Sequence, residues 1–152
     1  MKKLVKVLKE KGLTIGSIES MTGGLFASAI TDVPGASKVY KGSIVSYAVE
    51  EKINIVKVDQ KIINKFTVVS KEVAVEMAKK GRELLNVDVC VSVTGNAGPT
   101  CEPGDKPVGE VHVAVATKEF VKPFQIKTSG TRKQIRKLAV ELMEEFILNS
   151  LE

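Results

Sequence analysis

The chain has 152 residues, of which 43% are hydrophobic and 27% are charged, and this length is typical of one globular domain over residues 1–152. No apolar run approaches the roughly 20 residues that a membrane-spanning helix needs. The two cysteines are too few for a disulfide framework and are not spaced as a metal-binding pair. Composition therefore excludes a membrane protein, a disulfide-rich secreted domain and a structural zinc domain, and it favours a cytoplasmic protein.

The chain is basic, with 23 Lys and Arg against 18 Asp and Glu and a net charge of +5. A nucleic-acid interface needs its cations on one face, beside groups that read or stack on bases. Here the cations are spread from Lys2 to Lys137 among acidic residues, and the chain has no Trp. This pattern favours solvated helix faces and a few cations for an anionic small molecule, with no nucleic-acid or membrane partner.

The first third of the chain alternates between helical and strand patterns. Residues 2–11 place apolar side chains at helical spacing, and Gly12 follows as a helix stop. Residues 13–18 predict a strand, residues 22–30 predict a helix that ends at a Pro-Gly breaker, and residues 42–47 predict a second strand.

Three helices are expected next. Residues 50–56 and 60–66 predict two short ones, and residues 71–85 predict a longer one that begins after Ser70 as its N-cap. The apolar positions of the longer helix, Leu84 among them, are suited to burial.

The remaining elements complete the fold class. Residues 87–93 form a β-branched run that is typical of a strand covered on both faces, and the Gly- and Pro-rich residues 94–108 predict a long ordered loop. Residues 111–115 and 121–128 predict a hairpin, and residues 132–148 predict a last amphipathic helix. This order predicts a single layered α/β/α domain with a mixed β-sheet.

Residues 19–24 lie where a predicted strand passes into a helix. Ser20 or Thr22 can serve there simply as a helix cap. Gly23 and Gly24 favour a second interpretation, because they let another group approach the backbone where helix amides attract an anion.

Lys52 follows the second predicted strand. In a cleft its pKa would fall, and it could then take a proton from a serine hydroxyl, whereas the alternative is an ordinary solvated lysine. The only histidine, His112, lies in the middle of a predicted strand, where we expect a packed or surface residue. No other base is therefore available to a serine.

Residues 94–99 place small residues and free amides after a strand, at the edge where open α/β sheets bind ligands. A tight structural loop is the alternative. We expect Cys90 in the core, and nothing beside Cys101 marks it as a nucleophile. Arg132 and Arg136 lie one helical turn apart. We expect either that they bind a phosphate or that they are ordinary exposed arginines.

Six stretches in order resemble the C-terminal domain of the competence/damage-inducible protein CinA and its stand-alone form, the nicotinamide-nucleotide amidase. The family pattern Glu-Ser-Cys-Thr-Gly-Gly corresponds to Glu-Ser-Met-Thr-Gly-Gly here, and Tyr-Ser-Asn-Glu-x-Lys corresponds to Tyr-Ala-Val-Glu-Glu-Lys. The match extends over essentially the whole chain. The six stretches are residues 19–24, 31–36, 47–52, 69–70, 94–99 and 106–109.

The resemblance implies hydrolysis of the carboxamide of nicotinamide mononucleotide to nicotinate mononucleotide and ammonia. It implies that Ser20 is the nucleophile, Lys52 the base that activates it, and Tyr47 a hydrogen-bonding or proton-relaying partner. It implies no metal or organic cofactor, and the sequence offers no ligand cluster for one. The residues expected to bind the anionic nucleotide are Thr22, Gly23, Gly24, Thr94, Gly95, Lys106 and Arg132.

The chain departs from the family pattern around the expected pocket, and these departures leave an alternative open. The alternative is a non-catalytic or altered-specificity module that binds a nucleotide in the same pocket. We also expect a homo-oligomer, because a compact domain of this kind can pair through an edge strand or its last helix. The departures are at Met21, Val49, Asn96, residues 100–102 and Thr131.

Overall fold

The computed structural model describes all of residues 1–152 as one β-sheet between two layers of helices. A short 3-10 turn at Ala36–Lys38 precedes the second strand. The strands are β1 (Ile15–Glu19), β2 (Tyr40–Val45), β3 (Val89–Gly95), β4 (Glu110–Ala116) and β5 (Val121–Lys127). The helices are α1 (Lys2–Lys11), α2 (Leu25–Thr31), α3 (Val49–Asn54), α4 (Gln60–Phe66), α5 (Lys71–Leu85) and α6 (Arg132–Leu151).

The sheet is mixed, with the strand order β2-β1-β3-β4-β5. Strands β2, β1 and β3 are parallel, and Ser17 of β1 stands between Ser43 of β2 and Val91 of β3. Strand β4 is antiparallel to both β3 and β5, so the predicted hairpin is confirmed. The carboxyl ends of the three parallel strands consequently meet at one edge of the sheet.

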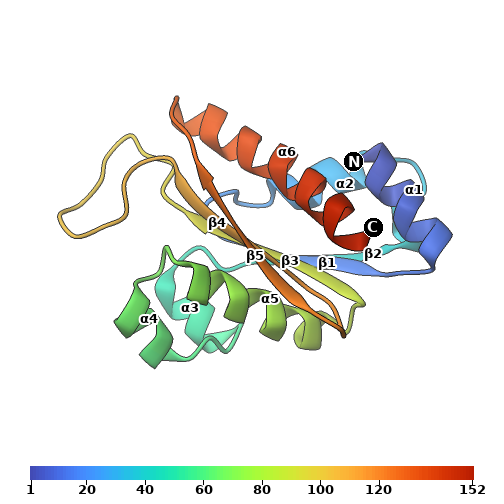
Figure 1. Ribbon diagram of the computed structural model, residues 1–152, viewed down its shortest axis with the longest axis horizontal. Helices are drawn as coiled ribbons and strands as arrows, with labels where there is room; N and C mark the ends of the chain where they lie inside the picture. The colour runs from blue at the N-terminus through green and yellow to red at the C-terminus, as the bar shows by residue number, and fades with distance from the viewer.

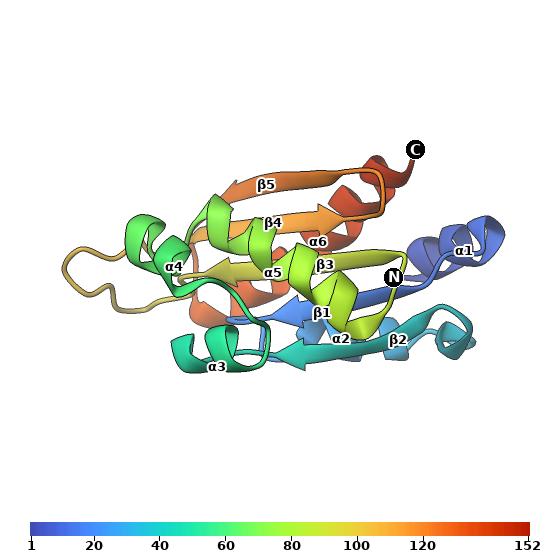
Figure 2. The same ribbon diagram turned by 90° about the horizontal axis from the view of Figure 1, so that it is seen from below.

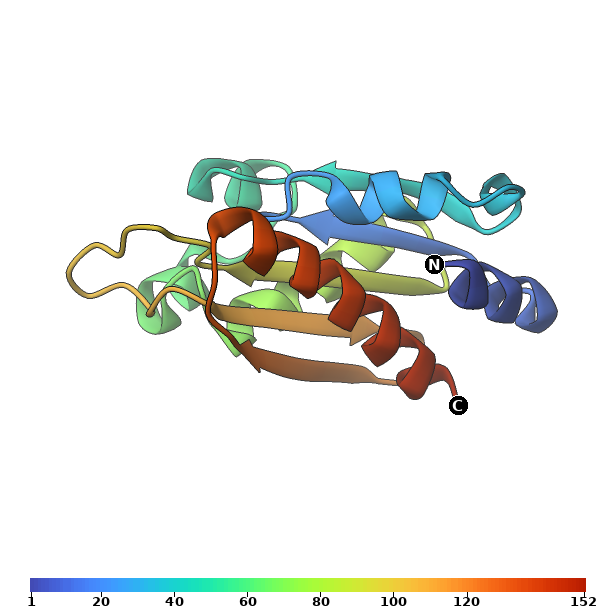
Figure 3. The same ribbon diagram turned by 90° about the horizontal axis from the view of Figure 1, so that it is seen from above.

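The helices divide between the two faces of this sheet. Helices α1, α2 and α6 cover one face (Figures 1 and 3), whereas α3, α4 and α5 cover the other (Figure 2). The layered α/β/α class predicted from the sequence is therefore confirmed.

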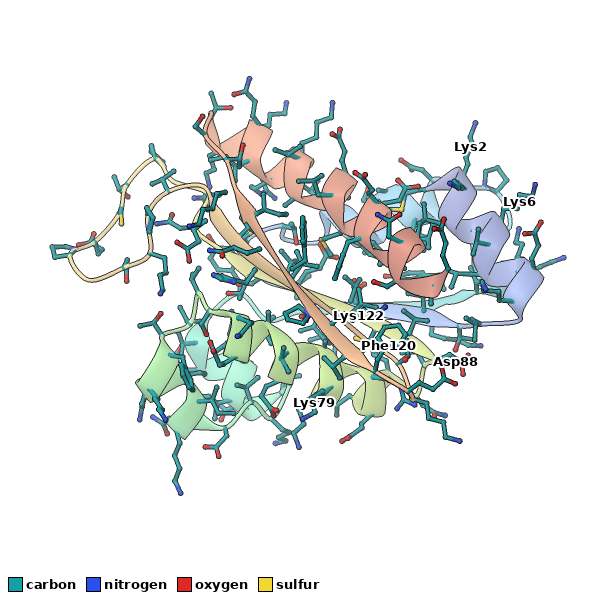
Figure 4. The ribbon with its side chains drawn as sticks, in the orientation of Figure 1. Lys2, Lys6, Lys79, Asp88, Phe120 and Lys122 are labelled. Atoms are coloured by element: carbon teal, nitrogen blue, oxygen red, sulfur yellow. The ribbon has the colours of Figure 1, made fainter.

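Three apolar clusters join the layers. The largest one, which includes Leu4, Phe26 and Met143, lies between the sheet and α1, α2 and α6. On the other face α5 packs closely on β1, since a Cβ built on Gly81 would lie 2.2 Å from a side-chain carbon of Ile18. Side chains at the edges of both layers reach solvent, as Lys2 and Lys6 of α1 do (Figure 4).

Every predicted helix and strand is present, and two expectations about their extent and burial are wrong. Helix α2 begins at Leu25 rather than Thr22, because Gly23 and Gly24 adopt φ values of 58° and 100° in the turn before it. Leu84 of α5 is 48% exposed, since it lies on the solvent side of the helix. None of the helices is long and apolar enough to cross a membrane.

Candidate active site

A pocket of about 340 Å³ lies where β1, β2 and β3 end, beside the long loop between β3 and β4 that projects from the sheet (Figure 2). Ligands of open α/β sheets bind at such an edge. The segments after all three strands supply its lining. The lining residues used below are Ser20, Met21, Tyr47, Val49, Lys52, Thr94, Gly95, Asn96, Glu102, Asp105, Lys106 and Arg132.

Ser20 and Lys52 meet at the floor of this pocket. Ser20 directly follows β1, and Lys52 belongs to the helix α3 that follows β2, so two neighbouring parallel strands bring them together. The Nζ of Lys52 lies 2.8 Å from the Oγ of Ser20. Both side chains are buried, with 7% of Ser20 and 1% of Lys52 exposed.

Burial changes the proton affinity of Lys52. Removal of the ammonium from water lowers the pKa of Lys52 from 10.5 to about 8. The Nζ also donates to the carbonyl oxygens of Ser46 at 2.5 Å and Tyr47 at 3.2 Å. A neutral amine has two N–H groups and one lone pair, which these two carbonyls and the Ser20 hydroxyl would satisfy. The arrangement therefore suits a lysine that accepts a proton from Ser20.

Glu19 anchors the turn that carries Ser20. Its carboxylate is fully buried and accepts hydrogen bonds from the amides of Gly24, Phe26 and Ala27 and from the Thr22 hydroxyl at 2.7 to 3.2 Å. This carboxylate therefore satisfies the amides at the start of α2. The alternative in which Ser20 or Thr22 caps the helix is wrong, because the N-cap residue is Gly24 and the Glu19 carboxylate accepts from the helix amides.

Tyr47 and Arg132 form the rim of the pocket on another side. The Tyr47 hydroxyl accepts a hydrogen bond of 2.8 Å from a guanidinium nitrogen of Arg132, and it bonds to neither Ser20 nor Lys52. A second guanidinium nitrogen of Arg132 donates to the carbonyl of Gly98 in the long loop. Thr131 starts α6 with a reciprocal capping box to Gln134, which holds Arg132 at the first turn.

The long loop forms the remaining wall. Thr94 and Gly95 line the pocket at the end of β3, and the Thr94 hydroxyl donates to the carbonyl of Val68 at 3.0 Å. Asn96 braces the loop, because its amide donates to the carbonyl of Lys106 and its oxygen accepts from the amide of Gly98, each at 3.0 Å.

Four of the residues singled out in the sequence do not line the pocket. Thr22 bonds to Glu19, and Gly23 and Gly24 donate their amides to the Ser20 carbonyl and to Glu19. Arg136 donates to the carbonyls of Met21 and Thr22. Substrate binding by Thr22, Gly23 and Gly24 stays a prediction that this geometry does not favour.

The histidine and cysteines lie outside the pocket lining. His112 is 7% exposed and its Nε2 lies 2.9 Å from a carboxylate oxygen of Glu110, which matches the expected packed residue. Cys90 is in the core, where burial raises the pKa of its thiol to about 12, and Cys101 is exposed in the loop. No three His, Cys, Asp or Glu side chains come together as a metal site.

The sequence interpretation gave no role to Glu19, which lies inside residues 19–24, or to the carbonyl of Ser46, which directly precedes residues 47–52. The sequence signal for Glu19 was its position. It lies five to eight residues before the amides at the start of a helix, which attract a carboxylate. No sequence signal marks a main-chain carbonyl such as that of Ser46.

The chain is similar to known proteins throughout its length. A family model described as the CinA C-terminal domain matches residues 1–151. A competence-damage inducible protein of Caldicellulosiruptor saccharolyticus is 39% identical over 150 residues, which are 96% of this chain and 36% of that protein. A CinA-like protein of Flavobacterium psychrophilum is 40% identical over 148 residues, which are 97% of this chain and 35% of that protein. The chain thus spans about a third of the length of these curated relatives.

Solved structures show the same fold. The competence or damage-inducible protein of Enterobacter asburiae superposes with a TM-score of 0.96 at 26% identity, over 99% of this chain and 95% of that one. A CinA superfamily protein of Escherichia coli superposes with a TM-score of 0.94 at 28% identity, over 97% of this chain and 86% of that one. The chain belongs to the CinA C-terminal domain family.

Proposed function

We propose that this protein is an amidohydrolase that converts nicotinamide mononucleotide to nicotinate mononucleotide and ammonia, with Ser20 as nucleophile and Lys52 as its base. The observation that carries the proposal is the 2.8 Å contact between the Lys52 Nζ and the Ser20 Oγ at the floor of a pocket. A nucleophile within hydrogen-bonding reach of a base with a lowered pKa is the arrangement that acyl transfer needs.

In the first half of the reaction, the Ser20 Oγ attacks the carboxamide carbon and its proton passes to the Lys52 Nζ. The tetrahedral intermediate then expels the amide nitrogen, which takes that proton from Lys52 and leaves as ammonia. An ester between Ser20 and the nicotinoyl group remains. The carbonyls of Ser46 and Tyr47 hold the Nζ in place through both proton transfers.

In the second half, a water molecule attacks the ester carbon and gives its proton to Lys52. Collapse of this intermediate breaks the bond to the Ser20 Oγ, which takes the proton back, and nicotinate mononucleotide is released. Lys52 thus acts as base and then as acid in each half-reaction, which a pKa near the working pH allows.

Two cations that line the pocket, one in the wall and one on the rim, suit the phosphate of the nucleotide. Lys106 and Arg132 both line the pocket, and neither forms an ion pair with a carboxylate of the chain. A guanidinium that already bonds to neutral groups keeps its charge for an anionic ligand. The amides at the start of α2 are less suited, because Glu19 occupies them.

The test is ammonia release from nicotinamide mononucleotide by the wild type, Ser20→Ala and Lys52→Ala. Lys61→Ala is the matched control, since Lys61 is an exposed lysine of α4. The proposal expects release by the wild type and the control and none by the two site variants, all four proteins being folded by circular dichroism. Binding of the nucleotide by the wild type without release would instead identify a binding module.

A further inference from the structure

We propose that Arg136 is a positioning residue, which fixes the turn after Ser20 and so directs the Met21 amide as the oxyanion donor of the pocket. This inference rests on the proposed function and deepens it. Arg136 lies one turn beyond Arg132 on α6, and it does not line the pocket.

Arg136 contacts the turn after β1 through two hydrogen bonds. The Nε of Arg136 donates to the carbonyl of Met21 at 2.9 Å, and a terminal guanidinium nitrogen donates to the carbonyl of Thr22 at 3.1 Å. The guanidinium lies close to the turn, since a Cβ built on Gly23 would be 3.2 Å from it. A planar fork with several N–H groups can hold two successive carbonyls in this way, whereas an ammonium acts as a point charge.

When Arg136 fixes the direction of these carbonyls, it also fixes the direction of the amides in the same peptide groups. In a trans peptide the C=O and the following N–H point in opposite directions, so a Thr22 carbonyl held by Arg136 directs the Gly23 amide away from α6. The Ser20 carbonyl accepts from the Gly23 amide, which directs the Met21 amide the other way. The Met21 amide donates to no group of the chain, and Met21 lines the pocket, whereas Thr22 is fully buried outside the pocket lining.

The Met21 amide stands directly after the nucleophile, where an acyl-transfer enzyme needs a donor for the developing oxyanion. The guanidinium also strengthens this donor, because a cation at the Thr22 carbonyl polarises the Gly23 amide, whose hydrogen bond polarises the peptide group of Ser20 and Met21. Arg136 forms no ion pair with any carboxylate, so its charge remains uncompensated beside the turn. An alternative role as a phosphate ligand fits less well, since two of its nitrogens are already bonded to the turn.

The test compares Arg136→Met and Arg136→Lys with Lys137→Met, a control that removes the neighbouring exposed cation of α6. For ammonia release from nicotinamide mononucleotide, we expect Arg136→Met to lower kcat about 100-fold, the typical effect of losing an oxyanion donor. KM should change less than about threefold, because ground-state binding is not altered. Arg136→Lys should recover part of kcat, and the control should match the wild type.

Labelling of Ser20 by a serine-directed fluorophosphonate separates this inference from the proposed function. It reports attack by the Ser20 Oγ on phosphorus, with loss of fluoride, without the nucleotide, and it should slow in Arg136→Met to a similar degree. If the wild type is labelled but releases no ammonia, only the assigned substrate fails, and the labelling rates still decide the role of Arg136. Wild-type kcat and labelling in a folded Arg136→Met, a raised KM alone, or a wild type that is neither active nor labelled would overturn the inference.

Discussion

The floor and the wall of the pocket are built in different ways. The floor consists of Ser20 and Lys52, which are buried and held by groups from β1, β2 and the helices after them. The wall is the loop between β3 and β4, where Glu102 and Asp105 are exposed and Asn96 bonds to other members of the same loop. The other end of the sheet, around Asp88 and Phe120, lies away from both (Figure 4).

This difference separates two requirements of a catalytic pocket. A nucleophile and its base must keep a fixed distance in a poorly hydrated place, which burial between strands provides. A wall that selects ligands needs only shape and charge, and an exposed loop can change these without disturbing the core. Several departures from the family pattern, at Asn96 and residues 100–102, lie in the wall, whereas Ser20 and Lys52 in the floor match it.

The largest expected effect comes from the floor. Lys52→Met should lower kcat/KM for ammonia release about 10³-fold, because general base catalysis typically contributes 10²–10⁴-fold. Steady-state kinetics of the folded variant measure this, with Lys61→Met as the control. Activity within tenfold of the wild type would show that Lys52 is not the base.

Glu19 should matter for stability more than any residue of the wall. Glu19→Ala leaves the amides at the start of α2 and the Thr22 hydroxyl without their acceptor in a buried place. We expect a loss of about 3 kcal/mol in the free energy of unfolding, measured by urea denaturation, with a smaller loss in Glu19→Gln. A loss under about 1 kcal/mol in Glu19→Ala would mean that water replaces the carboxylate at no great cost.

The pH dependence of activity should directly report the protonation of Lys52 in the floor. Lys52 acts as base only when neutral, and its pKa is lowered to about 8. Therefore kcat/KM should fall about tenfold per unit as pH decreases below about 8, and it should level off above that value. A profile that is flat between pH 6 and 8 would contradict the assignment.

The free energy of unfolding should also depend on the protonation of Lys52. Below pH 8 the folded state carries a buried ammonium, whereas between about 8 and 10.5 only the unfolded state binds this proton. The free energy of unfolding of the wild type, relative to Lys52→Met, should therefore rise with pH over this interval by about 1.4 kcal/mol per unit. Denaturation of both proteins at pH 7, 8.5 and 10 checks the sign.

The sequence predicted the fold and the two floor residues, and physical reasons explain what it missed. Hydrophobic periodicity and breaker residues located every α-helix and strand, including β5, which buries only Ile126, and α3, which buries only Lys52. Periodicity placed the start of α2 too early, since backbone conformation at Gly23 and Gly24 leaves no periodic signal. The partners of Lys52 are carbonyls of Ser46 and Tyr47, which every residue possesses, so only a structure reveals them. The distance between Ser20 and Lys52 likewise depends on strand register.

The smallest effect should come from the wall. Asn96→Ala removes the two bonds that brace the loop against Lys106 and Gly98, but it leaves Ser20 and Lys52 untouched. Two exposed or half-buried hydrogen bonds contribute about 1 kcal/mol, so KM for nicotinamide mononucleotide should rise about fivefold while kcat stays within about twofold. Gln60→Ala on α4 is the control. Asn86→Ala, at the end of α5, is unsuitable as a control, because Asn86 has a positive φ. A fall in kcat with unchanged KM would place Asn96 with the floor, because a wall that only holds the ligand alters ground-state and transition-state binding alike.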